Sequence, residues 1–241
     1  MDKKQVRLAV FRRLRKGIAI PDSRFHLRLS EFIPDFVGSD QAMQRLVEHD
    51  IWKKASTIFI TPDNCLEQLR LIALQQGKAV LVSTYGIRRG FVLLDFRIPK
   101  RRFLYAATLD GMEREGISVT LADIRAMFKG VDLLVTGTSA VTTSGLRVGK
   151  GHGFFDLEWA MFYSIGAVNT QTPVVAVVHD CQVVMADFTA DPFDTVCDLI
   201  ITPTQTIEVQ YPHKPTIGVI WNRLRPGMLR SIPPLRELRQ L

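Results

Sequence analysis

The apolar residues of this chain fall in short, nearly unbroken runs that are separated by longer polar segments. Runs rich in valine, leucine and isoleucine predict strands, and their continuous apolar character is typical of strands covered on both faces of a sheet. A later run, residues 216–221, predicts one more strand before the C-terminal tail. The main runs are residues 57–60, 79–83, 131–137, 173–178 and 199–203.

Helices are predicted between these runs. In residues 3–15, apolar side chains recur at every fourth position from Val6 to Leu14 and cations occupy the other side, which predicts an amphipathic basic helix. Residues 62–76 predict a helix that Gly77 is suited to end. This helix joins the first two strands, so these strands should be parallel, with a right-handed crossover. Further helices are expected at residues 39–49, 121–128 and 157–163.

The alternation of strands and helices predicts a single α/β domain in residues 1–221. Its core would be a doubly wound, mostly parallel sheet with helices on both faces. Residues 222–241 carry five arginines and three prolines and are expected to form a basic C-terminal extension, docked on the surface or loose. Ligands of such sheets bind outside the C-terminal ends of the strands, so polar residues that follow a strand are candidates for the site.

The composition is that of a folded globular protein. Hydrophobic residues make up 46% of the 241 residues, and no apolar run approaches the roughly 20 residues of a membrane helix. The basic N-terminal segment is not followed by an apolar signal core, so we expect a cytoplasmic protein without membrane contact. We expect it to be a monomer or a homodimer. Cys65, Cys181 and Cys197 lack the spacing of a zinc site or a disulfide framework and are expected to be packing residues.

A formal net charge of +7 favours anionic partners. ATP, a polyglutamylated folate and nucleic acid all suit this charge, which does not choose between them. Residues 100–103 hold three cations and one phenylalanine, which makes them a weak candidate for a nucleic-acid patch. Nucleic acid is therefore a less favoured partner than a small anionic molecule.

The strongest chemical signal is the loop from Arg147 to Asp156, which lies between a predicted strand and a predicted helix. Glycine occupies every second position from Gly149 to Gly153, which frees the backbone to turn its amides toward a ligand. The helix that follows would add its unpaired N-terminal amides and its dipole. Because Arg147 and Lys150 supply two cations, the loop predicts a phosphate site rather than a plain glycine-rich turn.

The spacing of these glycines differs from a P-loop and from the G-x-G-x-x-G dinucleotide motif. It resembles the phosphate loop of the 5-formyltetrahydrofolate cyclo-ligase (methenyltetrahydrofolate synthetase) family, Arg-Leu-Gly-Arg/Lys-Gly-x-Gly-Tyr-Tyr-Asp, with Phe154 and Phe155 at the tyrosines. Residues 166–168 and 177–182 are similar to the methenyltetrahydrofolate synthetase domain-containing branch, and the resemblance covers most of residues 1–221. The identical positions are Arg147, Gly149, Lys150, Gly151, Gly153 and Asp156.

The resemblance implies a fold and an activity. The fold would be the NagB/RpiA/CoA-transferase-like architecture. The activity would be the ATP- and Mg²⁺-dependent closure of 5-formyltetrahydrofolate to 5,10-methenyltetrahydrofolate, with phosphorylation of the formyl oxygen and release of ADP and phosphate. Such a reaction requires no protein nucleophile, because it depends on positioning and charge neutralisation.

The family's functional residues can be carried over to matching positions. Arg147 and Lys150 would be the catalytic cations, and the N-terminal helix would reach the nucleotide phosphates with its Lys-x-x-x-Arg pair. Asp156 would hold Mg²⁺, with Asp198 as a second carboxylate. The substrate would contact Asp63, Tyr85 and Phe155. The nucleotide would contact Lys3, Arg7, Gly149, Lys150, Gly151, His152, Gly153, Phe154 and Gln182.

The chain departs from the family pattern at the expected folate pocket. Asp63 and Leu66 replace its Glu-x-x-Thr, and Ser83 replaces a proline at the end of a strand. The aspartate reaches about 1.5 Å less than a glutamate. Two alternatives therefore stay open: an ATP-dependent enzyme with a non-folate substrate, such as one of thiamine metabolism, and a nucleotide- or RNA-binding regulator without catalysis. His179 is either a hydrogen-bonded structural residue or a proton carrier.

Overall fold

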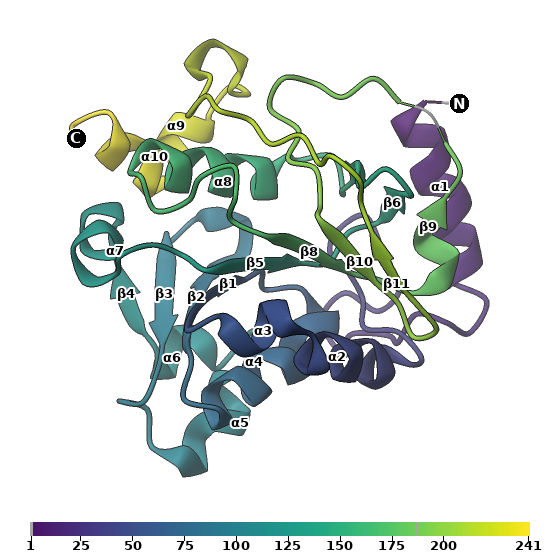
Figure 1. Ribbon diagram of the computed structural model, residues 1–241, viewed down its shortest axis with the longest axis horizontal. Coiled ribbons are helices and arrows are strands. Elements are labelled where there is room, and N and C mark those ends of the chain that lie inside the picture. Colours follow the sequence, from purple (N-terminus) through teal and green to yellow (C-terminus); the bar gives the residue numbers. More distant parts are fainter. Residues whose placement is uncertain (1, 187) are drawn as a thin grey trace.

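The computed structural model describes residues 2–186 and 188–241, which form three layers around one large sheet (Figure 1). The sheet has eight strands in the order β11-β10-β8-β5-β1-β2-β3-β4. This architecture confirms the predicted doubly wound, mostly parallel sheet. The strands are β1 (Thr57–Ile60), β2 (Ala79–Ser83), β3 (Phe91–Leu94), β4 (Ile117–Val119), β5 (Leu133–Thr136), β8 (Val174–Val177), β10 (Leu199–Ile201) and β11 (Thr206–Glu208).

Five neighbouring strands in the middle of the sheet are parallel, and antiparallel strands extend both edges. β1 pairs with β2 in parallel, with Thr57 opposite Ala79, which confirms the predicted strand–helix–strand unit. Alternate side chains of a strand point to opposite faces. In β1, Ile58 and Ile60 pack into the core on one face and Phe59 packs into the core on the other. Burial on both faces explains why this strand is apolar from Ile58 to Ile60.

Helices cover both faces of the sheet (Figure 1). The face that receives Ile58 is covered by α2 (Ser39–Glu48), α3 (Asp50–Lys54), α4 (Glu67–Gln75), α5 (Phe103–Ala106) and α6 (Met112–Glu115). The face that receives Phe59 is covered by α7 (Leu121–Met127), α8 (Phe154–Ser164) and α10 (Pro233–Leu238). Across residues 2–186 and 188–241, every helix falls short of the length and apolar content that a bilayer crossing requires.

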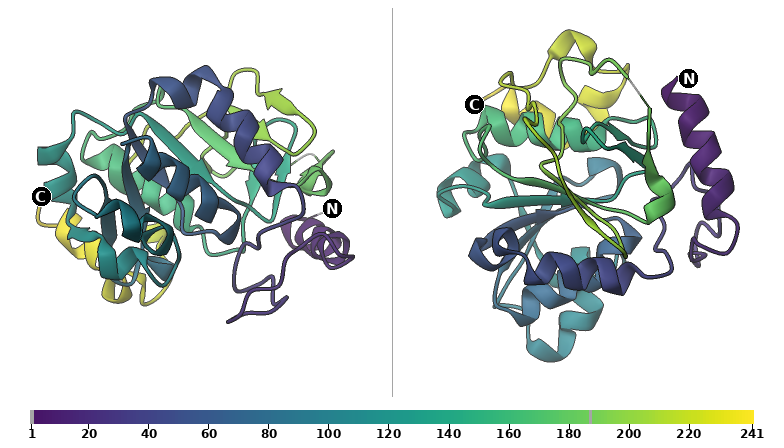
Figure 2. Two further views of the ribbon diagram at one scale, coloured as in Figure 1. Left: turned by 90° about the horizontal axis from the view of Figure 1, so that it is seen from below. Right: turned by 45° about the vertical axis from the view of Figure 1, so that its right-hand side comes forward.

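A second, smaller sheet stands beside the large one and was not predicted. It consists of β6 (Ala140–Thr142), β7 (Arg147–Val148) and β9 (Val183–Val184). Helix α1 (Lys3–Leu14) packs against it at one end of the molecule (Figure 2). Val6, Val10 and Leu14 are buried in this contact, as the spacing of apolar residues predicted. These strands have only two or three residues each, which is too short for a periodic signal in the sequence.

Two sequence predictions of local structure are wrong. Residues 216–221 are not a strand, and the last strand is β11, which pairs antiparallel with β10. The segment runs across α8 instead, where a Cβ at Gly218 would lie 2.1 Å from Ser164 Oγ and Trp159 Nε1 donates to Pro215 O at 3.1 Å. The predicted helix at residues 62–76 begins later, with a 3₁₀ turn (Asn64–Leu66) before α4.

The C-terminal extension is docked on the domain. It contains a 3₁₀ turn (Trp221–Arg223), α9 (Met228–Ser231) and α10, and it returns over α7 and α8 (Figure 1). Ile232 and Leu235 are 1% and 0% exposed and belong to the same core as α8. The extension therefore shares its hydrophobic core with the α/β domain. The remaining 3₁₀ turns are Tyr85–Ile87, Lys100–Arg102 and Asp180–Gln182.

A carboxylate of the extension also caps a helix of the domain. Glu237 accepts hydrogen bonds from the backbone amides of Leu121 (3.0 Å) and Ala122 (2.8 Å) at the N-terminus of α7. Replacing Glu237 with alanine should lower the free energy of unfolding by about 1 kcal/mol, because two amides lose their acceptor. Urea denaturation would measure this loss, and Gln240→Ala, at an exposed position of the same segment, is the control. Equal stability of the two variants would contradict the capping role.

Candidate active site

A cleft of about 380 Å³ opens at the C-terminal ends of β1, β2 and β5. Its floor includes Thr61, Ser83 and Thr136, which end or follow these strands. Its other walls are the start of α1, the segment 191–194 and residues 149–153, here called the glycine loop. The cleft therefore lies where ligands of parallel sheets are expected to bind.

The glycine loop needs its glycines for two different reasons. Gly151 has φ 102° and Gly153 has φ 70°, and residues with a Cβ adopt such left-handed conformations only under strain. Gly149 has no positive φ, and a Cβ there would meet nothing within 4 Å. Its missing side chain instead leaves open space in the wall of the cleft. The loop follows the β6–β7 hairpin, which intervenes between it and the central strand β5.

The amides of this loop are unpaired. Within the described residues, none of the eight backbone amides from 149 to 156 donates a hydrogen bond to a backbone carbonyl. The first amide of α8 that does so belongs to Leu157, which donates to Gly153 O at 3.0 Å. Gly153, the N-cap residue, supplies no side-chain acceptor. Unpaired amides at the N-terminus of an eleven-residue helix attract an anion.

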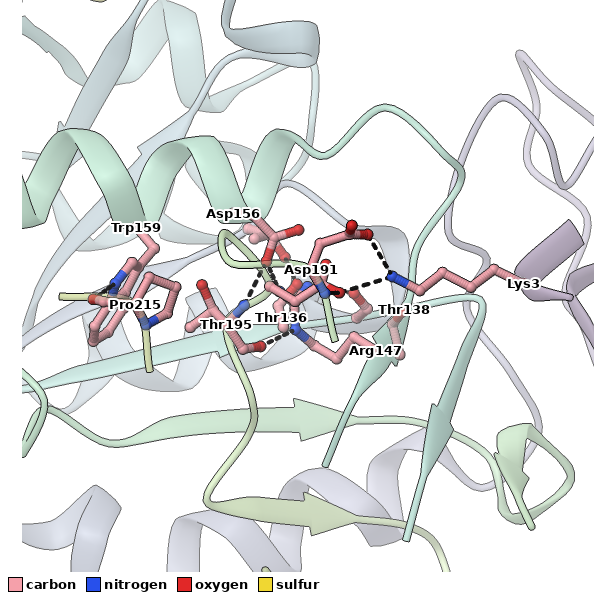
Figure 3. A network of polar contacts seen from close by, with 12 residues as sticks. Lys3, Thr136, Thr138, Arg147, Asp156, Trp159, Asp191, Thr195 and Pro215 are labelled. Carbon is pink, nitrogen blue, oxygen red and sulfur yellow. Dashed lines mark hydrogen bonds and ion pairs between the residues drawn. The ribbon is translucent and has the colours of Figure 1, made fainter. Parts of the chain in front are cut away.

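Arg147 and Asp156 form a buried ion pair beside the loop (Figure 3). The Arg147 guanidinium lies 2.5 Å from Asp156 Oδ1, and the two side chains are 6% and 16% exposed. Thr195 joins them, since its amide donates to Asp156 at 3.0 Å and its carbonyl accepts from Arg147 Nε at 3.2 Å. Burial raises the pKa of Asp156, and the charge of Arg147 opposes this increase. The pair joins the strand before the loop to the helix after it.

The two predicted cations of α1 both reach the cleft. Lys3 Nζ lies 2.7 Å from Asp194 Oδ2 and 3.3 Å from Asp191 Oδ2 (Figure 3). Burial lowers the pKa of Lys3, but these two carboxylates outweigh it and the pKa is raised. Arg7 Nε donates to Gly149 O at 2.6 Å, and burial lowers the pKa of its guanidinium. The contacts of Arg7 hold the glycine loop against α1.

Lys150 differs from the other cations of the cleft. Within the described residues it forms no ion pair: its Nζ donates to Glu31 O at 3.2 Å and lies 5.6 Å from the centre of the Tyr85 ring. The Tyr85 hydroxyl donates to the same carbonyl at 2.9 Å, and its ring stacks on Phe25 at 5.7 Å. Lys150 is therefore the loop cation that no carboxylate of the described chain pairs with directly.

Asp63 lines the cleft, as predicted, but one of its oxygens is already engaged. Asp63 Oδ2 accepts from Thr61 Oγ1 at 2.5 Å and from Gly137 N at 3.0 Å. Burial raises its pKa, and the charge of Lys150 opposes the increase. The other two departures from the family pattern, Ser83 and Leu66, have different environments. Ser83 lines the cleft, whereas Leu66 is buried in the core.

The two phenylalanines of the loop have different environments. His152 stacks on Phe154 with the ring centres 5.3 Å apart, and both rings lie at the edge of the cleft. Burial and the charges of Lys150 and Arg225 lower the pKa of His152. Phe155 is only 7% exposed, because its ring lies beneath the Arg147 guanidinium and packs into the core. Phe155 offers the cleft little surface.

Gln182 and Asp198 are not brought into the cleft. Gln182 donates to Thr138 O at 2.6 Å and accepts from the His179 amide at 2.8 Å. It therefore links the turn that follows β8 to the segment that precedes β6, next to the small sheet. Asp198 precedes β10 and thus lies at the N-terminal edge of the parallel sheet, 2.7 Å from Lys214 Nζ. Residues 179–182 follow β8 but do not line the cleft, because the chain turns there into β9.

Glu158 and Arg225 are among the cleft residues that the sequence did not indicate. Glu158 is 2% exposed, and its Oε2 has no hydrogen-bond partner in the part of the chain that the structure describes. A glutamate within the apolar helix 157–163 was a signal that went unused. Arg225 of the extension donates to Gly151 O at the cleft. The two residues are far apart in the sequence, so no local sequence pattern predicts this contact.

Residues 2–203 match the 5-formyltetrahydrofolate cyclo-ligase family. The methenyltetrahydrofolate synthase domain-containing protein of Homo sapiens is 37% identical over 211 residues, 86% of this chain and 54% of that protein. The protein of the same name from Danio rerio is 34% identical over 213 residues, 87% of this chain and 55% of that protein. The chain thus spans about half the length of these relatives.

Solved structures share the fold. The NMR structure of 5,10-methenyltetrahydrofolate synthetase from Aquifex aeolicus superposes with a TM-score of 0.55 at 18% identity, over 89% of this chain and 96% of that one. The 5,10-methenyltetrahydrofolate synthetase of Mycoplasma pneumoniae gives a TM-score of 0.50 at 14% identity, over 84% and 99%. Both likenesses extend across the layered α/β architecture.

Proposed function

Because this chain belongs to the 5-formyltetrahydrofolate cyclo-ligase family, we propose that it is an ATP- and Mg²⁺-dependent enzyme that closes 5-formyltetrahydrofolate to 5,10-methenyltetrahydrofolate. The observation that carries the proposal is the run of unpaired amides from residue 149 to residue 156, next to the N-terminus of α8. Lys150, which forms no ion pair in the described residues, supplies the charge that a polyphosphate requires.

The residues of the cleft suit ATP and Mg²⁺. Lys150 and the amides of the glycine loop would hold the phosphates, and Arg7 keeps that loop in place. Mg²⁺ is commonly held by one or two carboxylates together with substrate phosphates, and Asp156 lines the cleft at the loop. Asp191 and Asp194 line it as well, so either could replace Asp198, which lies at the opposite edge of the sheet.

ATP would supply the phosphoryl group that turns the formyl oxygen into a leaving group. The residues of the chain would orient the formyl group toward it and neutralise the charge that develops on the phosphates, which is the main protein contribution in phosphoryl transfer. Tyr85, which lines the cleft beside Lys150, offers an aromatic surface for the ring of the folate. These groups position and stabilise, and none has to form a bond to the substrate.

The test is a spectrophotometric assay of 5,10-methenyltetrahydrofolate formation from 5-formyltetrahydrofolate and Mg-ATP. The expected result is product formation that requires the nucleotide and stops when EDTA removes the metal. Product in the absence of ATP, or none under any condition, would refute the proposed reaction.

One observation favours a second candidate, a regulator that binds nucleotide or RNA without turnover. Phe154 and Phe155 bring no hydroxyl to the cleft, and Phe155 is buried. ATP binding without product formation, together with salt-dependent RNA binding on filters, would favour this candidate over the enzyme.

Gly149 gives a direct test of nucleotide binding. Gly149→Ala should leave the melting temperature unchanged, because its φ is not positive and its Cβ would meet no atom within 4 Å. The methyl group would, however, occupy space on the face of the loop that approaches the phosphates, and we expect ATP to bind roughly tenfold more weakly. Isothermal titration calorimetry with Mg-ATP measures the change.

The matched variant is Gly153→Ala, where the φ of 70° predicts a loss of stability of about 1 kcal/mol. Thermal unfolding of both variants separates the two effects: backbone strain lowers the melting temperature of Gly153→Ala, whereas a methyl group that only hinders ATP leaves that of Gly149→Ala unchanged. Wild-type ATP affinity in Gly149→Ala would contradict the role assigned to the loop.

A further inference from the structure

The glycine loop is held in place by side chains from elsewhere in the chain. Within the described residues, none of its own amides donates to a backbone carbonyl. The carbonyls of Gly149 and Gly151 instead each accept a hydrogen bond from an arginine. Glycine loses more conformational freedom on ordering than any other residue, so a loop that contains three glycines depends on such contacts for a fixed shape.

The two arginines come from opposite ends of the chain. Arg7 lies on α1, and its Nε donates to Gly149 O at 2.6 Å. Arg225 lies in the C-terminal extension, and its Nη2 donates to Gly151 O. Arg225 also lies outside residues 2–203, which match the family, so the family match does not account for this contact. The extension thus reaches one carbonyl of the loop, and α1 reaches another.

The backbone around Arg225 is anchored without the help of its guanidinium. Leu224 and Met228 pack against the core that contains α8. The Met228 amide donates to Arg225 O at 3.1 Å, and the extension continues into α9 and α10. Arg225 is itself exposed and lines the cleft. Removal of its side chain should therefore leave the extension docked and take away the contact with the loop.

We propose that Arg225 is a positioning residue for nucleotide binding, which fixes the Gly151 carbonyl and thereby keeps the glycine loop in the shape that receives phosphates. In a planar trans peptide the C=O and N–H groups point in opposite directions, so fixing the Gly151 carbonyl also fixes the direction of the His152 amide. A loop that orders only when it binds gives up affinity for that ordering, and a loop that is already ordered does not. The inference rests on the proposed function in taking the polyphosphate of ATP as the ligand.

The experiment combines two measurements on the full chain and on its variants Arg225→Ala and Arg225→Lys. The first is NMR relaxation of the backbone amides of residues 149–153 without ligand, and the second is calorimetric titration with Mg-ATP. We expect order parameters of about 0.85 in wild type and below about 0.6 in Arg225→Ala, which should bind Mg-ATP roughly tenfold more weakly. Arg225→Lys keeps a charged donor and should recover loop order and affinity together, at least in part.

The matched control is Arg223→Ala. Arg223 is an exposed arginine of the same segment that does not line the cleft, so its removal costs the same charge while the contact of Arg225 with the loop remains. This variant should match wild type in loop order and affinity, and melting temperatures show that each variant is folded. Wild-type loop order or wild-type ATP affinity in folded Arg225→Ala would overturn the inference. So would an equal loss of affinity in Arg223→Ala, or a recovery of affinity in Arg225→Lys without recovery of loop order.

The outcome is separable from that of the proposed reaction. Failure of product formation, with Mg-ATP bound by wild type and more weakly by a loosened Arg225→Ala, would refute the reaction and leave the role of Arg225 standing. Product formation by wild type, with Arg225→Ala equal to it in loop order and ATP affinity, would overturn the inference and leave the reaction standing. Absence of Mg-ATP binding by wild type would overturn both.

Discussion

Replacing Lys150 with alanine is expected to lower kcat/KM for ATP-dependent formation of 5,10-methenyltetrahydrofolate by a factor of roughly 100 or more. The side chain lies at the cleft, forms no ion pair within the described residues, donates to the Glu31 carbonyl and lies against the Tyr85 ring. Its removal therefore takes away charge stabilisation from the transferred phosphoryl group rather than support from the fold. Initial rates over a range of Mg-ATP concentrations provide the measurement.

The control for this substitution is Lys4→Ala. Lys4 lies on α1 one residue from Lys3, but it is exposed and does not line the cleft. The two variants lose the same charge, so any general effect of net charge on substrate attraction appears in both. Equal activity of Lys150→Ala and Lys4→Ala would contradict the catalytic role assigned to the glycine loop.

Breaking the buried pair of Arg147 and Asp156 should have the largest effect on stability. Arg147→Met leaves the Asp156 carboxylate buried without its cation, and we expect the free energy of unfolding to fall by about 3 kcal/mol. Burial already raises the pKa of Asp156 above its ordinary value, and loss of the guanidinium raises it further. The folded variant then binds a proton more tightly than the unfolded chain, so its stability should fall as pH rises from 5 to 8.

Chemical denaturation at both pH values measures this effect. In the double variant Arg147→Met/Asp156→Leu no charge is left buried, and most of the lost stability should return. Because both residues lie at the loop, ATP binding would remain weak in the double variant even where stability is regained. Wild-type stability of Arg147→Met at pH 8 would show that the pair contributes nothing.

The parts of the fold that were predicted depend on local patterns. Strand β1 is apolar from Ile58 to Ile60 because both of its faces are covered, and the helix that follows ends near Gly77. The buried side of α1 was visible as a spacing of four. The edge strands β4 and β11 and the small sheet were missed because these strands have only two or three residues, and the pairing of the small sheet depends on contacts between distant residues. Residues 216–221 have the apolar character of a strand, but packing on α8 decides their path.

In the candidate site, too, features with a local sequence pattern were predicted and features that depend on distant contacts were missed. The glycine loop could be found because its residues are contiguous, and its positions at Gly151 and Gly153 have the left-handed backbone that favours glycine. Glu158 and Arg225 were missed because their place in the cleft depends on the folded chain. Asp198 was misplaced for a related reason: its position in the sequence does not reveal that it precedes β10 and so lies at the opposite edge of the sheet.

The docked C-terminal extension affects how this domain should be produced. The match to the family ends at residue 203, whereas Leu235 fills the core beside α8 and Arg225 contacts the Gly151 carbonyl. An expression fragment that stops at the family boundary would bare an apolar face and remove a wall of the ligand cleft, which invites aggregation and loss of binding. Recombinant versions of this domain should therefore extend through α10.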